Sequence, residues 1–146
     1  KPHAIVVGAD PLDDSVNETE WKGNGRHLRD VCHENLSKAG VLDKVEIIED
    51  FSQNVGKTWN RPVDLLLIDG DHREEMALLD LRRFGCHVKL RGLMAIDDMN
   101  PLSDVRKAYK KWIAEENTAL PQRRWEVIRC TEDENSDKMW LLRRTA

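Results

Sequence analysis

One stretch of the sequence decides the fold: VDLLLIDGDH, at residues 63–72. Its first part is almost entirely apolar, which is typical of a strand buried on both faces of a sheet. Acidic residues and a glycine follow at once, and this composition indicates that the strand ends in a turn. We therefore expect a central strand over Val63–Asp69, with Asp71 and His72 just beyond its carboxyl end.

Strand and helix patterns alternate on both sides of this stretch. The helical segments carry apolar residues at helical spacing, and Gly40 stands where a glycine commonly ends a helix. Asn100-Pro101 is a start signal, with Asn100 as the cap and Pro101 at the first helical position. The expected elements are strands Ala4–Asp10, Val45–Asp50, Val63–Asp69 and Gly92–Asp97, helices Arg26–Ala39, Arg73–Phe84 and one after Asn100, and final strands Trp125–Thr131 and Lys138–Leu142.

This order predicts an α/β fold with a mostly parallel sheet covered on both faces. The last two strands flank a polar turn, Glu132–Asp137, which indicates an antiparallel hairpin at the C-terminal end. The polar segment Pro11–Gly25 is expected to be a loop. Neither a repeat nor a domain boundary is visible, so we expect a single domain over residues 1–146.

Composition excludes several classes of protein. The chain has 146 residues, of which 40% are hydrophobic, enough for one core. Its net charge of −4 provides no basic surface for nucleic acid, and its longest apolar run, Leu65–Ile68, is too short to span a membrane. The first residue is Lys1 and no signal peptide is visible. We expect a cytoplasmic chain that begins partway through a longer gene product.

Acidic residues gather at the predicted strand ends. Asp10 ends the first strand, Asp50 the second, Asp69 the third and Asp97-Asp98 the fourth. Ligands of open α/β sheets bind beyond the carboxyl ends of the strands, so these carboxylates are expected to line one edge. Asp69 and the Asp97-Asp98 pair could supply hard oxygen ligands to Mg²⁺. The alternative for each single Asp is a turn former or a helix cap.

Three segments together resemble a known family: VDLLLIDGDH (63–72), Asp80-Leu81 in the following helix, and VKLRGLMAIDDMN (88–100). They look like the class I S-adenosylmethionine-dependent methyltransferases. More narrowly, they resemble the metal-dependent O-methyltransferases related to macrocin O-methyltransferase. The resemblance implies a Rossmann-like sheet and methyl transfer to a hydroxyl of a small molecule, such as a sugar.

The resemblance also implies roles for individual residues. Asp10 would accept hydrogen bonds from the ribose hydroxyls of S-adenosylmethionine, and Asp50 and Ser52 would lie near its adenine. Asp71 would be the general base, with His72 as its support or as an alternative base. The cofactor-binding set is then Asp10, Asp50, Ser52 and Asp69, and the ligands of Mg²⁺ or a similar divalent cation would be Asp69, Asp97 and Asp98.

This sequence departs from the family pattern in three places. The family's first strand and its glycine-rich loop would precede Lys1, Glu49 replaces the usual glycine after the third strand of the family, and the usual turn before Asp97-Asp98 is reduced to Leu90-Arg91-Gly92. Two explanations stay open: a chain whose upstream part holds the missing strand, or a degenerate relative. The second would make the chain a methyltransferase-fold interaction module that has lost its cofactor site.

Phosphatases of the haloacid dehalogenase type also use Asp-x-Asp after an apolar strand. That fold needs this motif on its first strand, whereas Asp69-Gly70-Asp71 follows two earlier strands here. The sequence therefore favours the methyltransferase. Its expected partner is a small-molecule hydroxyl acceptor, with neither nucleic acid nor a membrane involved, and a homo-oligomer is compatible with the sequence.

Overall fold

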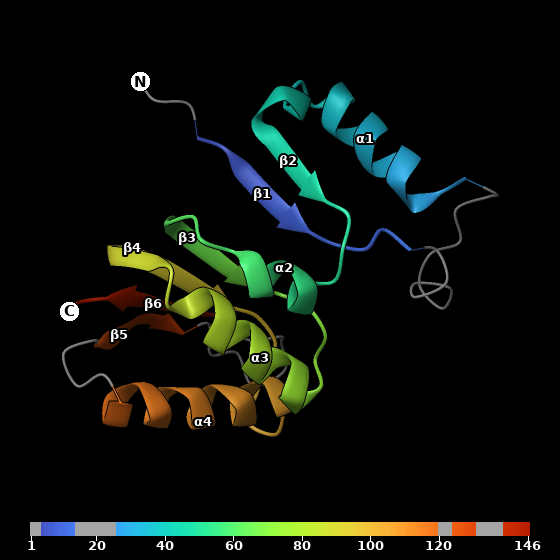
Figure 1. The fold of residues 1–146 in the computed structure, drawn as a ribbon. Helices are drawn as coiled ribbons and strands as arrows, with labels where there is room; N and C mark the ends of the chain where they lie inside the picture. Colours follow the sequence, from blue (N-terminus) through green and yellow to red (C-terminus); the bar gives the residue numbers. More distant parts are fainter. Residues whose placement is uncertain (1–3, 14–25, 120–123, 131–138) are drawn as a thin grey trace. The chain divides into compact units, whose positions relative to one another are not determined.

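A computed structural model of the chain describes residues 4–13, 26–119, 124–130 and 139–146 (Figure 1). Most of the expected loop Pro11–Gly25 and the expected turn Glu132–Asp137 lie outside these residues. The chain divides into two compact units, Lys1–Val55 and Gly56–Ala146, and each is described by itself.

The first unit contains a parallel pair of strands and a helix. Strands β1 (Val6–Ala9) and β2 (Val45–Ile48) pair in parallel, with Ala9 opposite Ile48. Helix α1 (Leu28–Lys38) and the short 3₁₀ helix η1 (Leu42–Lys44) connect them. Helix α2 (Ser52–Thr58) follows β2 and crosses the division between the units.

Helix α1 ends as the sequence predicts. Gly40 adopts a φ of 67°, in the left-handed region that glycine reaches without steric cost. Its N–H donates to the carbonyl of Ser37, and the N–H of Val41 donates to the carbonyl of Leu36. These two bonds form the motif that satisfies the last carbonyls of a helix, so Gly40 is confirmed as the residue that ends α1.

The second unit is a four-stranded sheet with two helices on one face (Figure 1). The strand order β3-β4-β6-β5 joins one parallel pair, β3 with β4, to an antiparallel hairpin of β5 and β6. The elements are β3 (Val63–Ile68), α3 (Glu74–Gly85), β4 (Val88–Ile96), α4 (Asp104–Ala119), β5 (Trp125–Cys130) and β6 (Trp140–Arg144). This arrangement confirms the predicted α/β class and the antiparallel hairpin.

The core of this unit lies between the sheet and its helices. Trp112 of α4 and Leu81 of α3 are almost fully buried against Met94 and Ile96 of β4 and Leu142 of β6. Their burial stabilises the unit, because each large apolar side chain contributes roughly 1.5–3 kcal/mol when it is removed from water. Ile68 and Ile96, the last residues of β3 and β4, belong to this core.

Strand β3 is an edge strand of this sheet, so the prediction of a central position is wrong for the second unit as described. Its side chains alternate: Ile68 faces the core and is 6% exposed, whereas Leu65 and Leu67, which point to the opposite face, are 60% and 54% exposed. The continuous apolar run predicts burial on both faces, but α3 and α4 cover only one of them.

Strand β4 begins earlier than the predicted Gly92, at Val88. The register against β3 shifts between Val63 and Leu65, and Arg91 adopts a φ of 66°. A Cβ on Gly92 would lie 2.8 Å from the carbonyl oxygen of Lys89, so this position requires glycine. The turn expected before the strand is therefore an irregularity within it.

Helix α4 begins later than the sequence predicts. Asn100 and Pro101 form a turn, in which the N–H of Ser103 donates to the carbonyl of Asn100. The helix starts at Asp104, and the hydroxyl of Ser103 accepts a hydrogen bond from the N–H of Arg106 at 3.1 Å. Ser103 is therefore the cap, because its side chain satisfies an N–H that has no partner within the first turn.

Candidate active site

The candidate site lies where β3 and β4 end side by side. The parallel register pairs Ile68 with Ile96, and the N–H of Asp97 donates to the carbonyl of Ile68 at 3.0 Å. The next residues of both strands are therefore acidic and adjacent: Asp69 after β3, and Asp97 followed by Asp98 after β4. The edge position that the sequence predicts for these carboxylates is the one the fold gives them.

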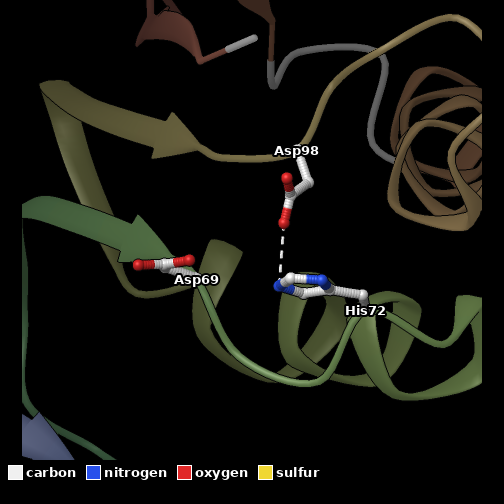
Figure 2. Close-up of side chains that lie close together, drawn as sticks. All are labelled: Asp69, His72 and Asp98. Atoms are coloured by element: carbon white, nitrogen blue, oxygen red, sulfur yellow. Dashed lines mark ion pairs between the residues drawn. The ribbon is translucent and has the colours of Figure 1, made fainter. Parts of the chain in front are cut away.

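Three side chains converge in this place (Figure 2). One ligand atom each from Asp69, His72 and Asp98 lies within 4.8 Å of the others. Nε2 of His72 lies 2.8 Å from Oδ2 of Asp98. Two carboxylates and an imidazole at this spacing could hold a divalent cation: the carboxylates suit Mg²⁺ or Mn²⁺, whereas the imidazole favours a transition metal. Of the predicted ligands, Asp69 and Asp98 belong to this group, and His72 completes it.

Asp97 contributes to the same site without joining this group of three. It is partly buried and lines a pocket together with Asp69 and Asp98. The pocket is formed by the two loops and by the helices behind them, with a lining of Ile68, Asp69, Gly70, Asp71, His72, Ala77, Asp80, Asp97, Asp98 and Val105.

The surroundings of Asp69 disfavour the charged form of its carboxyl group. The pKa of Asp69 is raised, first because partial desolvation disfavours its charged carboxylate and then because Asp97 and Asp98 repel it. The positive form of His72 acts in the opposite direction. A cation bound among these side chains would relieve the repulsion, so the electrostatics of the site fit a metal.

Asp98 has an unusual backbone conformation. Its φ is 55°, in the left-handed region that residues other than glycine seldom adopt, although Asp and Asn tolerate it best. Such strain persists only where the surrounding structure imposes it, and it is common at functional sites. Here it turns the chain sharply after β4 and brings the Asp98 carboxylate to His72.

The predicted base, Asp71, is engaged by Arg73. The Arg73 side chain donates from Nε to both carboxylate oxygens of Asp71, at 3.0 and 2.9 Å, and from Nη2 to Oδ2 at 2.5 Å. These hydrogen bonds are the main reason that the pKa of Asp71 is lowered. Asp71 is therefore ionised at neutral pH but is a weaker base than an ordinary aspartate.

The other predicted cofactor residues lie in the first unit, at the ends of its paired strands. Asp10 follows β1, and its Oδ1 accepts the N–H of Leu12 at 2.7 Å. Asp50 follows β2, and its Oδ1 accepts the N–H of Phe51 at 2.7 Å and Nδ2 of Asn54 at 2.9 Å. Ser52 is the first residue of α2. The parallel pairing of β1 with β2 thus places Asp10 and Asp50 at the same edge of this unit.

Besides the place of His72 among the three converging side chains, sequence reasoning missed two features of the site. The first is the pairing of Arg73 with Asp71, for which the sequence gives no signal beyond proximity. The second is Asp80, a buried acid that lines the pocket from α3. A signal for it does exist, because Asp80 lies three residues after Ala77 and four before Phe84, within the apolar stripe of a helix.

Comparison with known protein families assigns the chain to one of them. The profile of a family described as "Methyltransferase domain" matches residues 6–99, which is more than half of the chain. No curated protein matches the sequence.

Solved structures similar to this chain include the O-methyltransferase NovP, with a TM-score of 0.66 and 18% identity, over 97% of this chain and 60% of NovP. A Bacillus cereus O-methyltransferase in complex with S-adenosylhomocysteine (SAH) has a TM-score of 0.61 and 12% identity, over 97% and 73%. An rRNA methylase from Streptococcus thermophilus has a TM-score of 0.60 and 12% identity, over 99% and 89%.

These likenesses show the same fold. No described helix is long and apolar enough to cross a membrane. The family match leads to one conclusion: the chain belongs to the methyltransferase-domain family, and it has the Rossmann-like fold of the methyltransferases it is similar to.

Proposed function

We propose that this chain transfers a methyl group from S-adenosylmethionine to a hydroxyl of a small molecule, such as a sugar, with the help of a divalent metal ion. The observation that carries the proposal is the convergence of Asp69, His72 and Asp98 at the carboxyl ends of two strands. Four structural neighbours are named O-methyltransferases, which favours an oxygen acceptor. A net charge of −4 favours a small acceptor over RNA, although two neighbours are named rRNA methylases.

The metal would be held by Asp69 and Asp98, with Asp97 or His72 as a further ligand. Such an ion supplies a Lewis acid that lowers the pKa of a bound hydroxyl. The chain's own carboxylates contribute orientation, because two acidic segments on adjacent strands hold an acceptor at a fixed place beyond the sheet.

The proton of the acceptor hydroxyl would pass to Asp71 or His72. Arg73 keeps Asp71 ionised and oriented, and Asp98 orients the His72 ring. As the new oxygen–carbon bond forms, the sulfur–carbon bond of the donor breaks, and the base takes the proton. The products are a methyl ether, SAH and the protonated base.

The nucleoside part of the donor would be bound from the first unit. Asp10 would accept hydrogen bonds from the ribose hydroxyls, and Asp50 and Ser52 would lie near the adenine. Backbone N–H groups already donate to both carboxylates, which fixes the orientation that these acids present to a ligand.

Calorimetric titration with SAH, followed by transfer from labelled S-adenosylmethionine to a panel of sugars and catechols, tests this function. We expect stoichiometric binding of SAH, and transfer that needs Mg²⁺ and stops in EDTA. A folded protein that binds no SAH would instead be the interaction module without a cofactor site. Transfer that is unaffected by EDTA would remove the metal from the mechanism.

A pair of matched variants locates the site. Asp98→Asn removes one charge from the cluster and is expected to abolish metal-dependent transfer while SAH still binds. Asp64→Asn is the control, because Asp64 lies near the start of β3, is 83% exposed and pairs with Lys89. Equal activity of the two variants would contradict the assignment of Asp98.

A further inference from the structure

Asp80 is the single charged residue that is buried in the described part of the chain, with 4% of its surface exposed. It lies in α3 among residues that pack into the core, such as Ala77 and Leu81. Burial of a carboxylate costs several kcal/mol unless nearby donors or a cation compensate for it. An apolar residue would fill this position at a lower cost in free energy, so the presence of an acid here needs an explanation.

The position of Asp80 suggests that reason. A Cβ built on Gly70 would lie 3.3 Å from Oδ2 of Asp80, so the buried carboxylate packs directly against the middle of the loop Asp69–His72. Asp80 also lines the pocket that contains Asp69 and Asp98. Helix α3 thus brings an acceptor group against the loop that carries two of the three converging side chains.

Asp80 is poorly placed for a purely structural role. Its pocket is also lined by four other acids, Asp69, Asp71, Asp97 and Asp98, and a fifth carboxylate there would add to their repulsion. Groups that orient metal ligands from behind are typically hydrogen-bonding side chains of this kind, and their loss weakens metal binding.

We infer that Asp80 is a positioning residue. Its carboxyl group packs against the loop Asp69–His72 from the side of α3 and fixes the course of that loop, so that Asp69 and His72 lie at the correct distance from Asp98. This role rests on the proposed metal-assisted function. Asp80 acts through the loop, and its contribution is to metal affinity as well as to stability. Gly70 is the matching feature, because any larger residue there would push the Asp80 carboxylate away.

The test compares Asp80→Asn with Leu81→Ala, its neighbour in the core, which is 0% exposed. Binding of Mn²⁺ is measured by electron paramagnetic resonance of the free ion, at a temperature where circular dichroism shows each variant to be folded. We expect Asp80→Asn to weaken Mn²⁺ binding by about tenfold or more. Leu81→Ala should lower the melting temperature and leave Mn²⁺ affinity unchanged. Wild-type affinity in Asp80→Asn would overturn the inference.

A second readout separates this inference from the proposed function. Hydrogen exchange of the amides of residues 69–73, without metal, should be faster in Asp80→Asn than in the wild type, while Leu81→Ala affects α3 and the core. A wild-type protein that binds no Mn²⁺ would refute the metal assignment, and exchange alone would then decide the role of Asp80. If Asp80→Asn does not fold, Gly70→Ala replaces it: weaker Mn²⁺ binding supports the inference, and unchanged binding overturns it.

Discussion

At the scale of single residues, the left-handed backbone of Asp98 predicts a difference between two variants. Asp98→Gly and Asp98→Ala both remove the carboxylate, but only glycine adopts a φ of 55° without strain. We expect the glycine variant to be the more stable by about 1 kcal/mol, measured by urea denaturation without metal. Both variants should lose Mn²⁺ binding equally. An alanine variant as stable as the glycine variant would show that the site does not impose this conformation.

Arg73 predicts the pH dependence of activity. Its hydrogen bonds lower the pKa of Asp71, so Asp71 stays ionised to a lower pH than an ordinary aspartate. In Arg73→Gln the pKa of Asp71 rises, and activity should therefore be lost at a higher pH when the solution is acidified. The measurement is the acidic limb of the kcat/KM profile.

Arg82→Gln is the control for Arg73, because Arg82 lies in α3 and pairs with Glu115 away from the site. An acidic limb that stays at the same pH in Arg73→Gln would mean that Asp71 is not the base. His72 would then be the remaining candidate.

At the scale of elements, the cap of α4 predicts which of two polar residues matters for stability. Ser103→Ala removes the hydroxyl that accepts the N–H of Arg106 and should cost about 1 kcal/mol of unfolding free energy. Asn100→Ala removes a side chain whose Oδ1 accepts one N–H at 3.3 Å, in the turn before the helix, and should cost less. Urea denaturation of both variants measures the difference. The reverse order would restore Asn100 as the cap.

The sequence predicts elements well where one local signal acts alone. Gly40 ends α1 because a left-handed residue satisfies the last carbonyls, and the fold confirms it. Asn100-Pro101 also looks like a start signal, but Ser103 follows closely and competes with it. The local sequence is compatible with either residue as the cap. The packing of α4 on the core selects between them, and this packing depends on residues far apart in the sequence.

At the scale of the molecule, the sequence predicts the edge of the sheet better than the contacts at that edge. Strand periodicity and the parallel order place Asp69 and Asp98 after neighbouring strands, because carboxyl ends of parallel strands meet. The convergence of His72 with them depends on the course of a loop, and the burial of Asp80 depends on the rotation of α3. Neither is fixed by residue spacing. The edge position of β3 could not be predicted from the sequence either, because an apolar run indicates burial but does not show which elements cover the strand.

Removal of the metal should change the free energy of unfolding at neutral pH, because this free energy is linked to the charge of Asp69. The raised pKa of Asp69 means that the folded state binds this proton more tightly than the unfolded state. Without metal, Asp69 therefore costs stability at neutral pH, and the cost disappears as the pH falls through its folded pKa. Asp69→Asn should be more stable than the wild type at pH 7 in EDTA, and the difference should vanish in acid.

Metal reverses that order, because binding requires the ionised carboxylate of Asp69. At a Mg²⁺ or Mn²⁺ concentration of 100 times the dissociation constant, the wild type should gain about 2.7 kcal/mol, while Asp69→Asn gains nothing. Melting temperatures of both proteins, in EDTA and in metal, between pH 4 and pH 7, measure the crossing. A variant that is stabilised by metal as much as the wild type would show that the ion binds elsewhere. A variant that is less stable than the wild type in EDTA would show that Asp69 stabilises the fold through contacts other than its charge.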